Sequence, residues 1–335
     1  MGISKPADKA TYQTGQNTAT RENHLLKTLR KDWQLYVLLI PIIFFFFTWR
    51  YLPMQGILIS FKNYKIQDGV MGSDFAGFIY FIELFTGPSS GEFWRAFRNT
   101  FMLNVYALLF AFPAPIILAL LFSEIRNVFY RTSVQTLSYL PNFISNVIIT
   151  TLIILLTANT HGTVGVVTKL CQFVGLIGEE AQLLYEPVYF RQVFIISDIW
   201  VRAGYDSIVY FAAIMGIPPS NYEAARVDGA TKLDQIRYIT LPGINTTFTI
   251  MLILRIGQML QVAFEKVLLL YNAQTYEIAD VLSTYVFRVG VGDFHNVAVS
   301  PSLATAAGLF ESIIGMVLVI GANFISRKIS DTSVF

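Results

Sequence analysis

Runs of apolar residues long enough to cross a bilayer constrain this chain more than any other feature of its sequence. A helix needs about 20 consecutive apolar residues to span about 30 Å of hydrocarbon, and several stretches of the chain reach that length. Charged residues make up 14% of the chain and hydrophobic residues 54%, whereas a soluble domain carries about 25% charged residues. The sequence therefore predicts an all-α membrane protein that crosses the bilayer about six times.

Two regions are expected from the distribution of these stretches. Residues 1–33 form a polar N-terminal segment, and residues 34–335 form the transmembrane domain. The expected spans lie near residues 34–59, 101–122, 134–157, 193–216, 243–263 and 303–325. The first stretch is longer than the apolar core of a signal peptide, which has about 7–15 residues, and no small-residue cleavage site follows it. We therefore expect it to be a membrane span.

The distribution of basic residues predicts the orientation of the spans. Lys and Arg are enriched in the cytoplasmic segments of membrane proteins. In this chain they are denser in one alternating set of segments, namely residues 1–32, 123–133, 217–242 and 326–335. Both termini and the loop 217–242 are therefore expected in the cytoplasm.

Residues 217–242 are expected to form two short helices between the fourth and fifth spans. Pro218 and Pro219 end the preceding helix, because proline cannot continue the hydrogen-bond ladder. Ser220 stands three residues before Glu223, which is the spacing of a capping box, so a new helix is expected to begin there.

The second half of this loop contains further signals for helix ends. Gly229 suits the left-handed position that closes a helix. Thr231 and Asp234 repeat the capping spacing for a second short helix, and Pro242 marks the entry to the next span. Capped helical loops also occur in membrane proteins without any docking partner, so these signals alone leave the role of the loop open.

The residues of the loop resemble the EAA signature of binding-protein-dependent importer permeases, EAA-x3-G-x9-I-x-L-P. Every fixed position is matched, by Glu223, Ala224, Ala225, Gly229, Ile239, Leu241 and Pro242. The stretch from Trp200 to Ala230 resembles the sugar-importer branch that includes the maltose permease. The stretch 279–290, which begins ADVLSTYV, resembles the LplB/YteP type of polysaccharide and oligosaccharide permeases.

This resemblance implies a type I ABC importer permease, a non-catalytic subunit in the plasma (inner) membrane of a bacterium. In the family, the loop inserts into a groove of a separate ATPase subunit. The implied coupling residues are Glu223, Ala224, Ala225, Asp228, Gly229, Ala230, Ile239, Leu241 and Pro242. ATP and Mg²⁺ are expected in that ATPase, because this chain has no G-x-x-x-x-G-K-[ST] phosphate loop.

The resemblance also implies the partners of the chain. They are a second permease subunit, two ATPase subunits or domains, an external solute-binding protein, an oligosaccharide and the lipid bilayer, with no nucleic acid. The alternative function is an ion-coupled secondary carrier, which would be expected to show internal inverted repeats. The sequence shows no such repeats. A metal site is not expected, because Cys171 is the single cysteine and the three histidines have no ligand spacing.

Charged residues within the predicted spans are candidates for a substrate path, because a charge in the membrane is costly and tends to be functional. Asp198, Arg202 and Asp206 recur every four residues on one face of the fourth span. Arg255 and Glu311 lie in the fifth and sixth spans. One interpretation is an internal ion pair between Asp198 and Arg202 that lets the helix pack, and the other is a cavity lined by this face.

Comparison with the maltose permease adds further positions to the candidate path. Val201, Arg202 and Tyr205 correspond to positions where that relative touches sugar, and Gln258 and Gln261 fall near its other contacts. The identities differ, since the asparagines of the relative are missing and Arg202 replaces a glycine. The candidate path is Asp198, Val201, Arg202, Tyr205, Arg255, Gln258 and Gln261. Arginine pairs with carboxylates in two-point contacts, so we predict an oligosaccharide that contains uronic acid.

Overall fold

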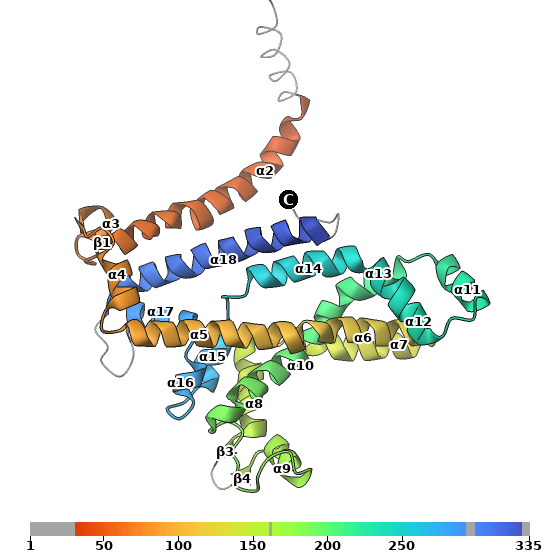
Figure 1. The fold of residues 1–335 in the computed structure, drawn as a ribbon. Helices are drawn as coiled ribbons and strands as arrows, with labels where there is room; N and C mark the ends of the chain where they lie inside the picture. Colours follow the sequence, from red (N-terminus) through yellow and green to blue (C-terminus); the bar gives the residue numbers. More distant parts are fainter. Residues whose placement is uncertain (1–30, 161–162, 293–298, 330–335) are drawn as a thin grey trace, which may run out of the picture. The chain divides into compact units, whose positions relative to one another are not determined.

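The computed structural model describes residues 31–160, 163–292 and 299–329, and most of this part of the chain is helical (Figure 1). The chain forms two compact units, Met1–Gly56 and Ile57–Phe335. In the first unit, α2 (Trp33–Phe46) continues into a π-helical segment, Phe47–Tyr51. A 3₁₀ helix, Leu52–Phe61, follows and contains the boundary between the two units.

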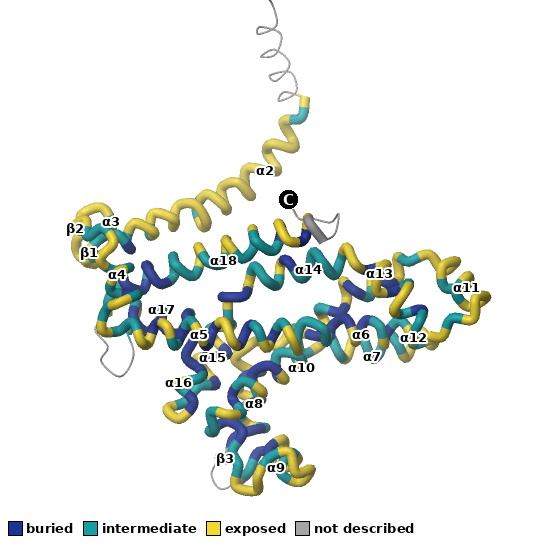
Figure 2. Tube along the Cα trace, viewed as in Figure 1, coloured by how far each residue is buried: buried dark blue, intermediate teal, exposed yellow. Residues whose placement is uncertain are grey.

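The helix α2 is apolar on every side. None of its residues is buried, and it is exposed along its whole length (Figure 2). Phe44 and Phe47 expose 67% and 60% of their surface. A helix that is hydrophobic all round is typical of a segment that lipid or other membrane helices surround.

The second unit contains the remaining elements, which Figure 1 labels. Its first half consists of β1 (Lys62–Asn63), α3 (Gly69–Gly72), β2 (Asp74–Phe75), α4 (Ile79–Thr86), α5 (Ser90–Tyr106), a π-helical segment (Ala107–Ala111), α6 (Pro113–Glu124), α7 (Val128–Tyr139), a 3₁₀ turn (Leu140–Phe143), α8 (Asn146–Thr157), β3 (Asn159–Thr160), β4 (Thr163–Val164) and α9 (Val166–Phe173). Its second half consists of α10 (Pro187–Met215), α11 (Pro219–Val227), α12 (Lys232–Gln235), a π-helical segment (Ile236–Thr240), α13 (Leu241–Gly243), α14 (Asn245–Gly257), α15 (Phe264–Leu270), α16 (Tyr276–Ala279), α17 (Leu282–Val291) and α18 (Pro301–Ile329). The strands form two antiparallel pairs, β1 with β2 and β3 with β4.

The long helices of the second unit pack side by side (Figure 1). The helix α10 lies against α6 and α7, α14 lies against α18, and α17 lies against α5 and α18. The contact between α10 and α7 is close at Gly204, where an added Cβ atom would overlap the carbonyl of Ser138. Ile116, Tyr210 and Ile244 belong to the buried cluster that joins α6, α10 and the start of α14.

Three helical segments in the described part of the chain are long and apolar enough to cross a membrane, namely Trp33–Phe61, Ser90–Glu124 and Pro301–Arg327. Two bent helix pairs would raise the number to five if each is one span. The helix α10 is long enough but carries Arg191, Asp198, Arg202 and Asp206, so it is less apolar than an ordinary span.

The segment predicted as one span near 134–157 differs from a straight helix. Val128–Phe143 and Asn146–Thr157 are bent by 101° relative to each other. Pro141 lies in the 3₁₀ turn that ends the first arm, and Ile144 is extended. Proline removes a backbone donor and disfavours continuation of the α-helix, so the chain turns here.

Candidate substrate cavity and the loop between α10 and α14

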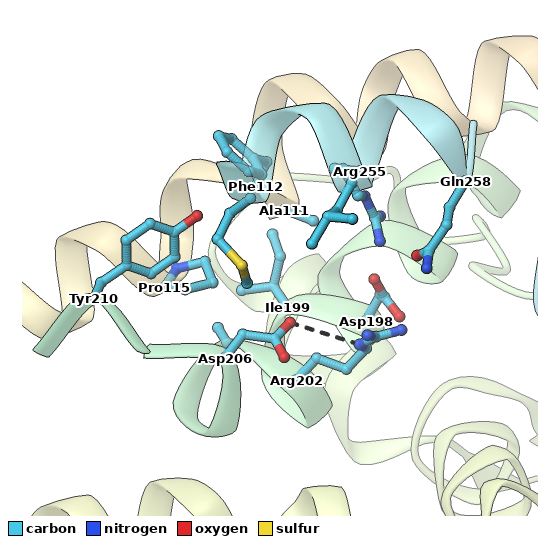
Figure 3. A pocket seen from close by; sticks show the side chains of 13 residues that line it. Ala111, Phe112, Pro115, Asp198, Ile199, Arg202, Asp206, Tyr210, Arg255 and Gln258 are labelled. Carbon is cyan, nitrogen blue, oxygen red and sulfur yellow. Dashed lines mark ion pairs between the residues drawn. The ribbon is translucent and has the colours of Figure 1, made fainter. Parts of the chain in front are cut away.

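A cavity of about 240 Å³ lies between α6, α10 and α14. Phe112, Pro115, Met251 and Leu254 contribute to its apolar wall. Its charged and amide side chains are Asp198, Arg202, Asp206, Arg255 and Gln258. Arg255 and Gln258 extend from the C-terminal end of α14 toward Asp198 and Arg202 on α10 (Figure 3). The cavity therefore has polar groups that converge from two helices onto one space.

The charged residues of α10 are paired differently from the predicted ion pair. Arg202 Nε lies 3.7 Å from Asp206 Oδ2, one turn further along the helix. Asp198 Oδ1 lies 4.0 Å from Lys266 Nζ on α15. Of the two interpretations of this face, the ion pair between Asp198 and Arg202 is therefore wrong, because Arg202 pairs with Asp206 and Asp198 pairs with Lys266.

Lys266 is a buried cation that contacts Asp198, one of the residues that line the cavity. Its ammonium group donates a hydrogen bond to the Phe194 carbonyl at 3.0 Å and lies 4.3 Å from the centre of the Phe194 ring. Burial lowers the pKa of Lys266 to about 8, although the carboxylate of Asp198 raises it. Lys266 is charged below this pH, and it then neutralises Asp198.

The loop after α10 contains the two predicted short helices, α11 and α12. Gly229 lies between them with a φ angle of 80°, a conformation that suits glycine. The Thr231 and Asp234 side chains form the predicted capping box at the start of α12. The hydrogen bonds from Thr231 lower the pKa of Asp234 below its ordinary value. These features confirm the predicted break and restart of the helix.

The predicted capping box at Ser220 is wrong. The helix α11 begins at Pro219, with Pro218 as the N-cap, and no side chain caps it. Proline is favoured at the first helical position because its fixed φ angle suits the helix and its missing N–H needs no partner there. The proline pair therefore starts the helix, and the Ser220 and Glu223 spacing is coincidental.

The loop presents both exposed and inward-facing residues. Glu223, Ala224, Asp228 and Gly229 are exposed, as are Leu241 and Pro242, whereas Ala225, Ala230 and Ile239 are half-buried. Val227 and Leu233 expose 88% and 75% of their surface.

A groove of about 690 Å³ separates α11 and α12 from the end of α6. Glu223 and Arg126 are among the residues that line it. The Lys232 ammonium of α12 lies 2.6 Å from a carboxylate oxygen of Glu124 at the end of α6. The loop is thus tied by an ion pair to a helix that also lines the cavity.

Comparison with known proteins gives relatives that span nearly the whole chain, although no family model matches it. Protein LplB of Bacillus subtilis (strain 168) is 38% identical over 319 residues, which cover 95% of this chain and 96% of LplB. The polygalacturonan/rhamnogalacturonan transport system permease protein YteP of the same organism is 38% identical over 318 residues, which cover 94% of each chain. This chain belongs to the carbohydrate ABC importer permeases.

A solved structure extends the comparison to the fold of this permease. A chain in the crystal structure of a bacterial alginate ABC transporter, in complex with an alginate pentasaccharide-bound periplasmic protein, is 42% identical. Its TM-score is 0.80, and the match covers 92% of the permease and 99% of that chain. The permease is therefore a membrane-embedded, non-catalytic transport subunit, and the alternative of an ion-coupled carrier gains no support from these relatives.

The cavity brings together four of the seven predicted path residues of the permease: Asp198, Arg202, Arg255 and Gln258. Val201 packs against a buried apolar cluster instead. Tyr205 lies against Phe143, with the ring centres 5.8 Å apart. Gln261 is exposed beyond the end of α14. These last three side chains do not line the cavity.

Two residues near the cavity were absent from the predicted path. Tyr210 lines it one turn beyond Asp206 on α10, a position that continues the four-residue spacing of the charged face. Lys266 of α15 lies beside Asp198, and no signal in the sequence near either residue indicates this contact. Glu311 of α18 does not line the cavity.

Proposed function

We propose that this permease forms part of the transmembrane path of an importer for oligosaccharides that contain uronic acid. The observation that carries the proposal is the convergence of Arg202, Arg255 and Gln258 on one cavity. A guanidinium group can bind a carboxylate through two parallel hydrogen bonds. The Gln258 amide can donate to and accept from sugar hydroxyls.

Both arginines have guanidinium hydrogen-bond donors available for the carboxylate of a ligand. Arg202 contacts Asp206 through one atom pair at 3.7 Å, which is longer than the about 2.8 Å of a strong charged hydrogen bond. Arg255 forms no ion pair with any carboxylate in the described part of the chain. An incoming uronate could bind both guanidinium groups, whereas a neutral sugar would leave Arg255 without an anionic partner among the described residues.

The size of the cavity supports a shared path. Its 240 Å³ is below the about 300–1,000 Å³ of ordinary ligand pockets, so it accommodates one sugar unit rather than an oligosaccharide. We propose that a second permease subunit completes the passage. The names of the relatives support a uronate cargo, because polygalacturonan and alginate are both polymers of uronic acids.

We further propose six spans, with both termini in the cytoplasm. The helix α10 would be the additional span, and its charges face the cavity and α15 instead of lipid. A charge in a span is tolerated when it faces the interior of the bundle or a polar cavity. The density of Lys and Arg in residues 217–242 supports a cytoplasmic loop.

The loop would be the contact with the ATPase. The motif, the exposed Val227 and Leu233, and the short helix α11 support docking into a groove of a separate subunit that binds ATP and Mg²⁺. The ion pair between Lys232 and Glu124 would transmit movement from the docked loop to α6. An external solute-binding protein would deliver the oligosaccharide.

Uptake by the complete complex in liposomes tests the cargo. The complex would contain both permeases, the ATPase and the binding protein, and the substrates would be oligogalacturonates and their neutral methyl esters. We expect ATP-dependent uptake of the free acids in preference to the esters. Arg202→Gln and Arg255→Gln should each lower uptake efficiency by about 10- to 100-fold, since a hydrogen bond to a charged group contributes about 1.5–3 kcal/mol.

Arg98→Gln provides the matched control, because Arg98 on α5 is exposed and does not line the cavity. This variant should transport as the unaltered complex does. Equal uptake of acids and esters would refute the uronate proposal, and so would full activity of both cavity variants.

A further inference from the structure

A second pocket, of about 480 Å³, lies next to the cavity along α10. Tyr106 at the end of α5 and Phe110 in the following π-helical segment form one wall. Arg191, Gln192, Ile195 and Ile199 form the other wall. Ile199 also lines the cavity that contains Arg202, so the two spaces adjoin at this side chain.

Arg191 is a cation without a carboxylate partner in the described part of the chain. Its Nη2 group lies 3.4 Å from Asn99 Oδ1, and its guanidinium lies 5.9 Å from the centre of the Tyr106 ring. Its Nε atom is shielded from solvent and has no hydrogen-bond partner among the described residues. The hydrogen bond to Asn99 uses Nη2, so the Nη1 group of this guanidinium remains available as a donor beside the pocket.

Asn99 fixes the position of this guanidinium. The Asn99 side-chain amide donates to the carbonyl oxygens of Glu277 and Asp280, at 2.8 and 3.0 Å. Because both contacts use its nitrogen, the oxygen of the amide is left facing Arg191. Asn99 is fully buried, so the acceptor is held by the fold and Arg191 is oriented before any ligand arrives.

A different buried arginine shows how the fold neutralises a cation that has a structural role. Arg288 forms two hydrogen bonds with Asp280 and one with Glu92. Arg191 has no such carboxylates, yet it borders a pocket large enough for a ligand. An anionic ligand in this pocket could therefore bind the guanidinium of Arg191.

The spacing along α10 places Arg191 and Arg202 on one path. Arg191, Ile195, Ile199 and Arg202 follow one another at intervals of four, four and three residues, so they share one face of the helix. The two arginines are eleven residues apart, which corresponds to about 16 Å at about 1.5 Å per residue. This separation exceeds one sugar unit and requires an oligosaccharide to bridge it.

We propose that the pocket at Arg191 is a second binding site for a carboxylated sugar unit of the same oligosaccharide. Arg191 would bind the carboxylate, the Tyr106 ring would pack against the sugar ring, and Gln192 would bind a hydroxyl group. This proposal depends on the proposed function. It adds that the protein holds acidic oligosaccharides at two points, near the start of α10 and at its middle.

The test compares acidic substrates of two lengths in the complete complex in liposomes. Digalacturonate is too short to reach both arginines, whereas hexagalacturonate can bridge them. Arg191→Gln should raise the KM for hexagalacturonate by about tenfold, the loss expected for a hydrogen bond between charged groups. The KM for digalacturonate and both kcat values should change by less than twofold.

Two further variants separate the role of the Tyr106 ring from a general effect of removing a positive charge. Tyr106→Leu removes the ring without changing charge and should also raise the KM for hexagalacturonate alone. Arg98→Gln makes the same charge change as Arg191→Gln at an exposed position of α5 and should leave both KM values unchanged. Co-purification of each variant with its partner subunits at the normal ratio establishes assembly.

The possible results separate the two proposals. If the unaltered complex imports neither acid, the proposed function itself fails. If it imports both acids and Arg191→Gln behaves as Arg98→Gln does, the second binding site is refuted while the proposed function stands. An equal loss for both lengths that changes with the anionic lipid content of the liposomes would overturn the sugar site and assign the pocket to a lipid headgroup.

Discussion

Replacing Arg288 by methionine should destabilise the permease strongly, because it leaves a carboxylate buried without its cation. Arg288 on α17 donates from Nη1 to Asp280 Oδ1 at 3.0 Å and from Nη2 to Asp280 Oδ2 at 3.1 Å. Asp280 has no exposed surface, and Arg288 is 6% exposed. The pKa of Arg288 is raised by its hydrogen bonds and charge interaction with Asp280, despite the opposing effect of burial. After the replacement, the Thr284 hydroxyl would be the remaining described side-chain donor to Asp280.

The magnitude follows from this burial. Removing one partner of a buried ion pair costs about 3–5 kcal/mol, so Arg288→Met should reduce the free energy of unfolding by that amount. Glu92 also contacts Arg288, at 3.2 Å, but its side chain is 53% exposed. Exposed ion pairs contribute about 1 kcal/mol or less, so Glu92→Gln should have a small effect. The double variant Asp280→Asn with Arg288→Met removes both charges and should be more stable than Arg288→Met alone.

Denaturant unfolding of the detergent-solubilised permease measures these differences. The expected order of stability is the unaltered protein, Glu92→Gln, the double variant and then Arg288→Met. Arg288→Met with the stability of Glu92→Gln would refute the buried-pair reasoning. A double variant less stable than Arg288→Met would refute it as well.

Two other residues give independent predictions. Lys266 has a pKa of about 8, below its ordinary 10.5. Between these two pH values the unfolded chain therefore binds more protons than the folded chain. The free energy of unfolding should rise over this range, by at most about 3 kcal/mol. Denaturant unfolding from pH 7 to pH 10 checks this, and persistence of the whole rise in Lys266→Met would contradict it. Glu223→Lys should abolish co-purification with the ATPase because it reverses the charge at the proposed contact. Glu265→Lys changes an exposed residue of α15 in the same way and should leave co-purification unchanged. Normal association of Glu223→Lys would show that Glu223 is not part of the contact.

Local sequence signals predicted the helical fold and much of the loop. Apolar length identified the segments around α2, α5–α6 and α18, because a span needs a long apolar run whatever surrounds it. Gly229 and the Thr231–Asp234 capping box were predictable because both act within a few residues of the chain. The Ser220 prediction failed where two local signals competed and the proline at the first helical position prevailed.

Tertiary contacts account for the errors at the candidate site. The spacing of Asp198 and Arg202 allows a pair on one helix, but nothing local indicates that Lys266 approaches from α15. Tyr205 is only three residues from Arg202, yet it packs against Phe143. Phe143 lies where the chain turns sharply between α7 and α8. Gln261 was expected within a span, but α14 ends at Gly257. Each error depends on how separate helices meet, which a single sequence does not encode locally.

The charges around the cavity have a consequence for how a cargo would be selected. The described groups in and beside the cavity are three cations, Arg202, Arg255 and Lys266, and two carboxylates, Asp198 and Asp206. Together they carry one positive charge in excess. An excess positive charge in a cavity attracts small anions from the solvent. A uronate can take the place of such an anion one for one, whereas a neutral sugar would expel it and leave a bare charge. Discrimination at this point in the protein would then work as ion exchange, and the shape of the sugar would matter less than the charge that it brings.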